Sequence, residues 1–364
     1  MLNKKTTNLL AGLLILGLTA PVLAGDLDIS GDYSIRHIMI KQDKSKHNQI
    51  GHSVSLNFNK EISSQLSIGL GVRTGDDRDQ YIELQDTNTG RINQAYLNYK
   101  PMDGLSITAG RDLVPFTTYS AVNFDPQLSI TGATGVYSQD LGAGLKLSAL
   151  LGYYLPTSMI SSHSSEGEKN VENPGFLAIQ PTIEYSVSDM ISVEGFFASY
   201  MKGKVEENGV KKEKNETINL LNLGVKATIR SVVPQVEVAT IYFDHIQNIN
   251  AEPKEYNEGY TVGLTVGAEK VNGLGDWVAS VDMAETYTVI GAKTGQGFAD
   301  YQDNIILQGM VAEDNRPVNS LILGLEVGLL DNLSAKVNYI SAKQKDATDA
   351  ETQTALIGEL TVRF

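Results

Sequence analysis

The residues of this 364-residue chain that could do chemistry are few and are not spaced for catalysis. Asp76, Asp77 and Asp79 form the densest acidic group, but they lack the spaced ligands of a calcium-binding loop and indicate a solvated segment. Metal binding by histidines such as His47 and His52 is likewise the weaker interpretation. The sequence contains no cysteine, which excludes thiolate catalysis, disulfides and cysteine metal sites. The sequence therefore predicts no enzyme, no cofactor and no metal site.

A different kind of chemistry is indicated by basic residues that alternate with apolar ones. Arg36, Arg73, Lys146 and Lys226 each occupy a polar position in a segment where neighbouring positions are apolar. Side chains that alternate with a period of two lie on opposite faces of a β-strand. These four cations therefore predict a charged face that lies opposite an apolar face. Such a charged face suits contact with water and dissolved ions.

The elements that would position these residues recur along most of the chain after residue 25. Apolar and polar residues alternate clearly in the segments 27–39, 53–59, 145–153, 221–229 and 260–268. No segment after residue 25 shows comparably strong helical periodicity. The chain is therefore predicted to be all-β, in a sheet with one apolar and one polar face.

The connections between the predicted strands alternate between short and long. Seven short connections are expected at 59–65, 100–104, 139–144, 186–190, 230–234, 271–275 and 330–332. Eight longer polar stretches are expected at 41–49, 74–90, 112–130, 154–176, 201–217, 244–258, 287–318 and 342–354. This alternation predicts a transmembrane antiparallel β-barrel of sixteen strands, with short periplasmic turns and long extracellular loops. Segment 304–311 is assigned to the seventh long loop; if it were a strand, an even count would require eighteen.

The first 24 residues have the pattern of a signal peptide that is cleaved after export. Lys4 and Lys5 precede an unbroken apolar run from Leu9 to Leu18, which is too short to span a membrane as a helix. The barrel is then residues 25–364, and removing the two lysines changes the formal net charge from −14 to −16. Such an acidic chain is not expected to bind nucleic acid.

The last strand carries a second targeting pattern. Leu356, Gly358, Leu360, Val362 and Phe364 alternate with polar residues, and the sequence closes on the aromatic ring. This pattern resembles the carboxy-terminal signal of bacterial outer-membrane barrels. The resemblance implies recognition of the strand ending at Phe364 by the barrel-assembly machinery.

A second local resemblance lies between residues 95 and 116. Ala95-Tyr96-Leu97-Asn98-Tyr99, a short turn, the segment 105–111 and Pro115-Phe116 resemble the strand–turn–strand that enters the pore loop of Gram-negative porins. Phosphate-selective porins share this pattern, but they tend to carry an aromatic residue and a lysine where this chain has Leu113-Val114. The resemblance implies a general diffusion porin, a homotrimer in contact with outer-membrane lipid and lipopolysaccharide.

The resemblance also implies how the charged residues are used. The third long loop, 112–130, would fold into the lumen and place Asp112 and Asp125 opposite Arg36 and Arg73. Opposed charges would create a transverse field across the water that sixteen to eighteen strands enclose. The alternative is that both aspartates cap turns. Arg91 and Arg111 fall on outward parity by simple alternation and are not assigned to the pore.

These features predict passive diffusion of ions and small hydrophilic solutes, with a mild preference for cations because acidic loops surround the mouth. A substrate-specific channel is the first alternative, in which Phe116, Tyr119, Tyr153 and Tyr154 would guide a sugar, organic or anionic solute. An outer-membrane enzyme or adhesin is the second alternative.

Overall fold

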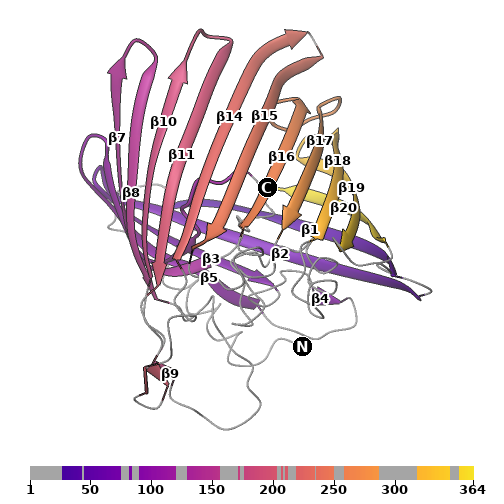
Figure 1. The fold of residues 1–364 in the computed structure, drawn as a ribbon, viewed down its shortest axis with the longest axis horizontal. Helices are drawn as coiled ribbons and strands as arrows, with labels where there is room; N and C mark the ends of the chain where they lie inside the picture. The colour runs from indigo at the N-terminus through magenta and orange to yellow at the C-terminus, as the bar shows by residue number, and fades with distance from the viewer. Residues whose placement is uncertain are drawn as a thin grey trace.

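The computed structural model describes most of the chain in one continuous sheet (Figure 1). The described residues are 27–42, 45–74, 82–83, 90–119, 129–155, 171–172, 176–202, 206–207, 210–211, 219–233, 235–249, 258–286, 318–344 and 352–364. The predicted signal peptide, Asp125 and the segment 304–311 lie outside these residues.

Sixteen long strands form the wall of a closed barrel. They are β1 (Leu27–Gln42), β2 (Ser45–Ser63), β3 (Leu66–Thr74), β5 (Gly90–Met102), β6 (Leu105–Leu113), β7 (Ser129–Gly142), β8 (Leu145–Leu155), β10 (Phe176–Ser186), β11 (Ile191–Lys202), β14 (Asn219–Val233), β15 (Val236–Asn248), β16 (Glu258–Gly267), β17 (Trp277–Thr286), β18 (Val318–Leu330), β19 (Leu333–Gln344) and β20 (Gln353–Arg363). Each long strand pairs antiparallel with the next, and β20 pairs back with β1. The predicted all-β barrel of sixteen strands is confirmed.

Four two-residue strands accompany the wall. β4 (Ile82–Glu83) pairs with β2, between β3 and β5 in sequence. β9 (Val171–Glu172), β12 (Glu206–Glu207) and β13 (Val210–Lys211) form a separate small sheet. This sheet joins the connection that follows β8 to the connection that follows β11.

The two faces of the wall differ in polarity, as the sequence pattern predicts. Leu147, Leu223, Val225 and Leu264 are exposed on the outer face, together with most of the large apolar side chains of the strands. The alternate, inward positions carry many polar side chains, several of them buried, together with two clusters of buried apolar side chains. Among the described residues, no helix is long and apolar enough to cross a membrane. Closure of the barrel gives the backbone groups of its strands hydrogen-bond partners, so an apolar outer face of this kind is suited to contact with lipid.

Several of the tight turns gather at one end of the barrel. The turns that join β7 to β8, β10 to β11 and β14 to β15 lie side by side at the top of Figure 1. Two predicted loops are shorter than expected, because β1 and β2 continue through most of 41–49 and β15 continues from Asp244 to Asn248. Their polar side chains misled the prediction, since ladder hydrogen bonds join backbone groups whatever side chains they carry.

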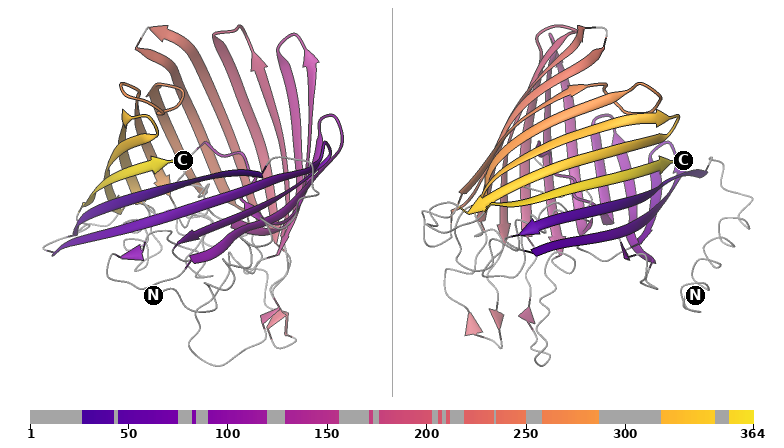
Figure 2. Two further views of the ribbon diagram at one scale, coloured as in Figure 1. Left: turned by 180° about the vertical axis from the view of Figure 1, so that it is seen from behind. Right: turned by 90° about the vertical axis from the view of Figure 1, so that its right-hand side faces the viewer.

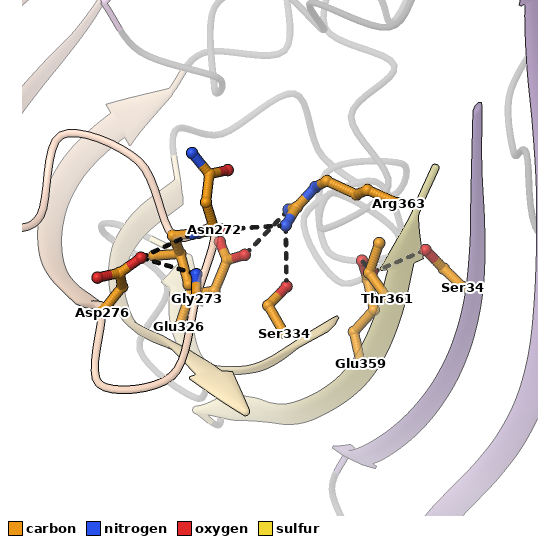
Figure 3. Close-up of polar contacts among 10 residues, drawn as sticks. Ser34, Asn272, Gly273, Asp276, Glu326, Ser334, Glu359, Thr361 and Arg363 are labelled. Carbon is orange, nitrogen blue, oxygen red and sulfur yellow. Dashed lines mark hydrogen bonds and ion pairs between the residues drawn. The ribbon is translucent and has the colours of Figure 1, made fainter. Parts of the chain in front are cut away.

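The seam between the first and last strands closes the barrel (Figure 2). Gly31 N donates to Phe364 O at 2.8 Å, and Phe364 N donates to Gly31 O at 3.0 Å. On the inner face of the seam, the hydroxyls of Ser34 and Thr361 are hydrogen-bonded at 2.8 Å (Figure 3). A Cβ at position 31 would meet Ser55 O and would lie 3.0 Å from the Phe364 ring. Glycine at position 31 therefore leaves room for the terminal ring.

Arg363 fastens the nearest turn to this seam. Its guanidinium donates to Val271 O and to Ser334 Oγ, each at 3.2 Å, and pairs with Glu326 at 3.0 Å (Figure 3). Asp276 accepts the backbone N–H groups of Asn272 (3.0 Å) and Gly273 (2.8 Å) within the same turn. These backbone donors lower the pKa of Asp276, because they stabilise its ionised carboxylate.

Deleting Phe364 is expected to reduce the yield of folded barrel, because two backbone hydrogen bonds of the seam are lost with it. The measurement is the fraction of heat-modifiable barrel recovered from outer membranes, compared with a Phe364→Tyr variant that keeps the ring and the backbone. An undiminished yield from the deletion variant would show that neither the seam nor the terminal signal depends on Phe364.

Candidate channel constriction

The first residues of the third long connection lie against the inner wall of the barrel. β6 ends at Leu113, and residues 114–119 continue from it. Phe116 is buried among three aromatic rings, with centroid distances of 4.7 Å to Tyr200, 5.4 Å to Tyr154 and 6.3 Å to Phe176. The Tyr200 and Tyr154 contacts have the edge-to-face geometry that aromatic pairs prefer. This aromatic cluster therefore holds the segment on β8, β10 and β11.

Two buried side chains of the wall form hydrogen bonds with residues 117–119, which belong to no strand. Gln180 Nε2 donates to Thr117 O at 2.8 Å, while Gln180 Oε1 accepts from Thr117 N at 2.7 Å. Asp244 Oδ2 accepts from Thr118 Oγ1 at 3.0 Å and from Tyr119 N at 3.1 Å. Asp244 is 0% exposed, so water does not compete for the hydrogen bonds that its carboxyl group accepts.

Tyr119 connects the segment to charged groups of the wall. Its hydroxyl donates to Glu194 Oε1 at 2.8 Å, and Glu194 Oε2 pairs with Lys226 Nζ at 3.3 Å. The same ammonium lies 4.8 Å from the centroid of the Tyr119 ring, within cation–π range. Burial and the hydrogen bond to Glu194 raise the pKa of Tyr119 far above its ordinary value, so the phenol stays protonated and keeps donating.

The wall is shaped to accept this segment. A Cβ at Gly224 would clash with the ring of Phe196 and would lie 2.9 Å from Tyr119 Cε2. Phe196 and Tyr119 pack edge to face with centroids 5.1 Å apart. Tyr242, 6.4 Å from the Tyr119 ring, donates in turn to Asp282 Oδ1 at 2.6 Å. Residues 114–119 therefore follow the interior of β8, β10, β11, β14 and β15, inside the barrel.

The predicted basic residues of the early strands lie on the inner face of the opposite wall. Arg36 alternates with the exposed Ile35 and His37, and Arg73 pairs with Ser55 on the inner row of β2. Their exposed fractions are 3% and 6%, so both arginines are buried rather than open to water. That they line the conducting path stays a prediction.

Arg91 joins this basic wall, contrary to the parity prediction. The register of β3 and β5 shifts between Gly71 and Val72, and Arg91 consequently pairs with Arg73 on the inner face. An extra residue in one strand reverses the alternation beyond it, as β-bulges do. Arg111 keeps its outward row, because it pairs with the exposed Ala95 and with Thr131.

The remaining predicted residues are separated from one another. Lys146 is exposed near the turn at the start of β8, in register with Asp140 and Glu184. Lys226 is the predicted pore residue that contacts the third long connection, through the ring of Tyr119. Asp112 belongs to β6 and not to the loop, and its Oδ1 accepts from Gln94 Nε2 at 2.7 Å and from Leu113 N at 2.8 Å. Asp125 lies outside the described residues.

Sequence reasoning missed Asp244 and misplaced Tyr153 and Tyr154, which belong to β8. Asp244 was assigned to a loop, although it continues the inward parity of Tyr242, which was the available signal. Phe116 and Tyr154 are buried in the aromatic cluster, and Tyr153 is exposed on the outer face. These three rings are therefore not placed to guide a solute through the lumen. Among the described residues, no group of three or more acidic or histidine side chains could hold a metal ion.

Comparison with solved structures identifies the class of this barrel. It has the fold of Gram-negative outer-membrane porins. OprB of Pseudomonas putida at high pH is similar over 93% of this chain and 94% of that chain, with 12% identity and a TM-score of 0.60. OmpF of Salmonella typhi in complex with daunomycin is similar over 93% of this chain and 98% of that chain, with 13% identity and a TM-score of 0.56. An anion-selective porin from Comamonas acidovorans is similar over 93% of this chain and 100% of that chain, with 11% identity and a TM-score of 0.54. No protein-family model and no curated relative matches the sequence.

Proposed function

We propose that the protein is an outer-membrane porin, a water-filled channel for passive diffusion of ions and small hydrophilic solutes. The observation that carries this proposal is the anchored segment 114–119 inside a closed sixteen-stranded barrel. A barrel of this size encloses more space than its own side chains fill, and an internal segment fixed to one wall narrows that space. The similar fold of OmpF and of the anion-selective porin supports the same function.

The charges of the two walls support a field across the lumen. Arg36, Arg73 and Arg91 lie on β1, β3 and β5, whereas Glu194 and Asp244 lie on β11 and β15. Seven wall strands lie between β1 and β11 in either direction around the barrel, and seven likewise lie between β3 and β15, so the two groups face each other. Opposed charges orient dipolar solutes and order the water between them.

We further propose a mild preference for cations. The sequence carries 43 acidic against 29 basic residues, and a negative vestibule concentrates cations within a Debye length of about 8 Å at physiological salt. Burial of Arg36 and Arg73 reduces the competing attraction for anions, because neither guanidinium is open to passing ions. Export by a cleaved signal peptide (1–24) and assembly as a homotrimer complete the proposal; detergent-extracted protein is expected to migrate as a trimer until it is heated.

The test is a single-channel recording of refolded protein in a planar bilayer with a salt gradient. We expect a reversal potential of cation-selective sign that shrinks as salt concentration rises. Neutralising Asp112, at the end of β6, and Asp125, between β6 and β7 in the sequence, with Asp112→Asn plus Asp125→Asn is expected to shift the potential toward anions. Asp103→Asn, in the exposed turn between β5 and β6, is the control for an unrelated charge change. A strongly anion-selective pore at low salt would contradict the proposed selectivity.

The same recordings separate the alternatives. Saturable block of the current by a sugar or an organic anion would favour a substrate-specific channel. Hydrolytic activity or cell binding without conductance would instead favour an outer-membrane enzyme or adhesin.

A further inference from the structure

The outer face of the barrel has an apolar groove of about 590 Å³ that crosses β7, β8, β10, β11 and β14. Two cross-strand rows of outward residues form it. The first row runs from Tyr137 through Ala149 to Pro181 and, beyond a break in the pairing, continues with Phe197 and Leu223. The second row runs from Gln139 through Leu147, Ile183 and Gly195 to Val225. All of these residues line the groove, and all of them are in the described part of the chain.

The groove exists because its floor is made of small or flat residues. Ala149 and Pro181 are directly opposite each other, and Gly195 is opposite Ile183 in the adjacent row. A Cβ at Gly195 would make only ordinary van der Waals contacts, the nearest at 3.5 Å, so a side chain can be added there without a clash. Larger outward side chains, such as Phe197 and Leu223, stand at its side and are exposed.

Pro181 adds a second irregularity at the floor. Proline has no backbone N–H and is uncommon in the interior of a sheet. The pairing of β10 with β11 is correspondingly interrupted between Ile179–Ser199 and Thr182–Phe196. Its compact ring, like the methyl group of Ala149 beside it, adds little height to the floor of the groove.

The part of the groove on β8, β10 and β11 lies close to the tight turns, and its β14 side, at Leu223 and Val225, reaches the middle of that strand. Ala149 and Gly195 are within five residues of the turn that precedes their strand, and Pro181 is within five residues of the turn that follows its strand. Five residues of a strand tilted by roughly 40° rise about 13 Å, which is half of an apolar band about 25 Å tall. The polar end of the groove is the Tyr137–Gln139 side, where the tyrosine hydroxyl donates to Gln139 Oε1 at 3.5 Å.

We propose that this groove binds the acyl chain of one phospholipid from the periplasmic leaflet, with its headgroup on the Tyr137–Gln139 side. An apolar trough with a polar pair at one end matches a molecule that is apolar along its length and polar at one end. A second copy of the chain suits it less, since a stable protein interface buries about 800 Å² on each partner, far more than a trough of this size provides. The proposal rests on the proposed function for the membrane location.

The test is native mass spectrometry of protein in mild detergent with added phosphatidylethanolamine. We expect one lipid to remain bound to the unmodified protein, and Gly195→Leu, which fills the floor, to lower the bound fraction several-fold. Gly358→Leu is the matched control, because it lies on the outer face of β20 and its added Cβ meets nothing within 4 Å. Ala149→Leu is a milder filling variant and replaces Gly195→Leu if that protein does not fold.

Three results would overturn the proposal. They are equal lipid loss in the groove and control variants, no lipid retained by the unmodified protein, and a dimer that forms through the groove and is lost in Gly195→Leu. Conductance is recorded from the same preparations. If the protein conducts but binds no lipid, the proposed lipid site is rejected and the proposed channel function is not. If it binds lipid but does not conduct, the channel function is rejected and the lipid site is not.

Discussion

Arginine in place of Leu264 is expected to lower the free energy of unfolding by about 2–4 kcal/mol. Leu264 is exposed on the outer face and pairs with Ile241 and Val281, near the middle of the neighbouring strands. A guanidinium at this position would be placed in hydrocarbon, where no partner or water replaces its hydration. The measurement is denaturant unfolding of the barrel in lipid vesicles.

Thr265→Arg is the matched control for this prediction. Thr265 is the next residue in β16 and lies on the inner row with Thr240 and Ser280. The same charge would then point into a polar interior, so the free energy of unfolding is expected to change little. Equal destabilisation by the two variants would show that the faces of β16 are assigned wrongly.

Phe116→Ala is expected to release the third connection from the inner wall. Removing a buried phenylalanine costs about 3–5 kcal/mol, and here the loss falls on the docking of one segment. Phe116 packs on Tyr154, Phe176 and Tyr200, so these rings would lose their shared partner. The barrel is expected to stay folded, because its ladders do not involve residue 116.

Single-channel recordings test this release. We expect a larger and noisier current from Phe116→Ala, since a freed segment no longer holds a fixed position in the lumen. Phe243→Ala is the control, because this substitution removes a ring of the same size from the exposed outer face of β15. A steady current of unchanged size in Phe116→Ala would mean that the anchored segment does not control the channel.

The barrel itself could be predicted from the sequence, because alternation is a local signal. A period of two in segments such as 145–153 and 221–229 defines both faces of a strand without knowledge of any partner. The count of sixteen followed from the alternation of short and long connections. The ends of strands were less certain, since the polar residues of 41–49 extend a hairpin instead of a loop.

The candidate site could be predicted only in part, because its contacts join distant segments. Gln180, Glu194 and Lys226 have inward parity in the sequence, but nothing local indicates that the first two bond Thr117 and Tyr119. The inward position of Arg91 depends on a register shift, and one extra residue in a strand leaves no clear mark in the pattern.

The seam between β1 and β20 has a consequence for how the chain folds. The bond between Ser34 and Thr361 joins residues 327 positions apart, so closing the barrel requires nearly the whole chain to be available. Bringing such distant strands together carries a loop-closure cost in entropy and slows folding, since contact order is high. Until the seam forms, the edges of β1 and β20 are unpaired templates for aggregation. The chain is therefore exposed to aggregation until its first and last strands have met.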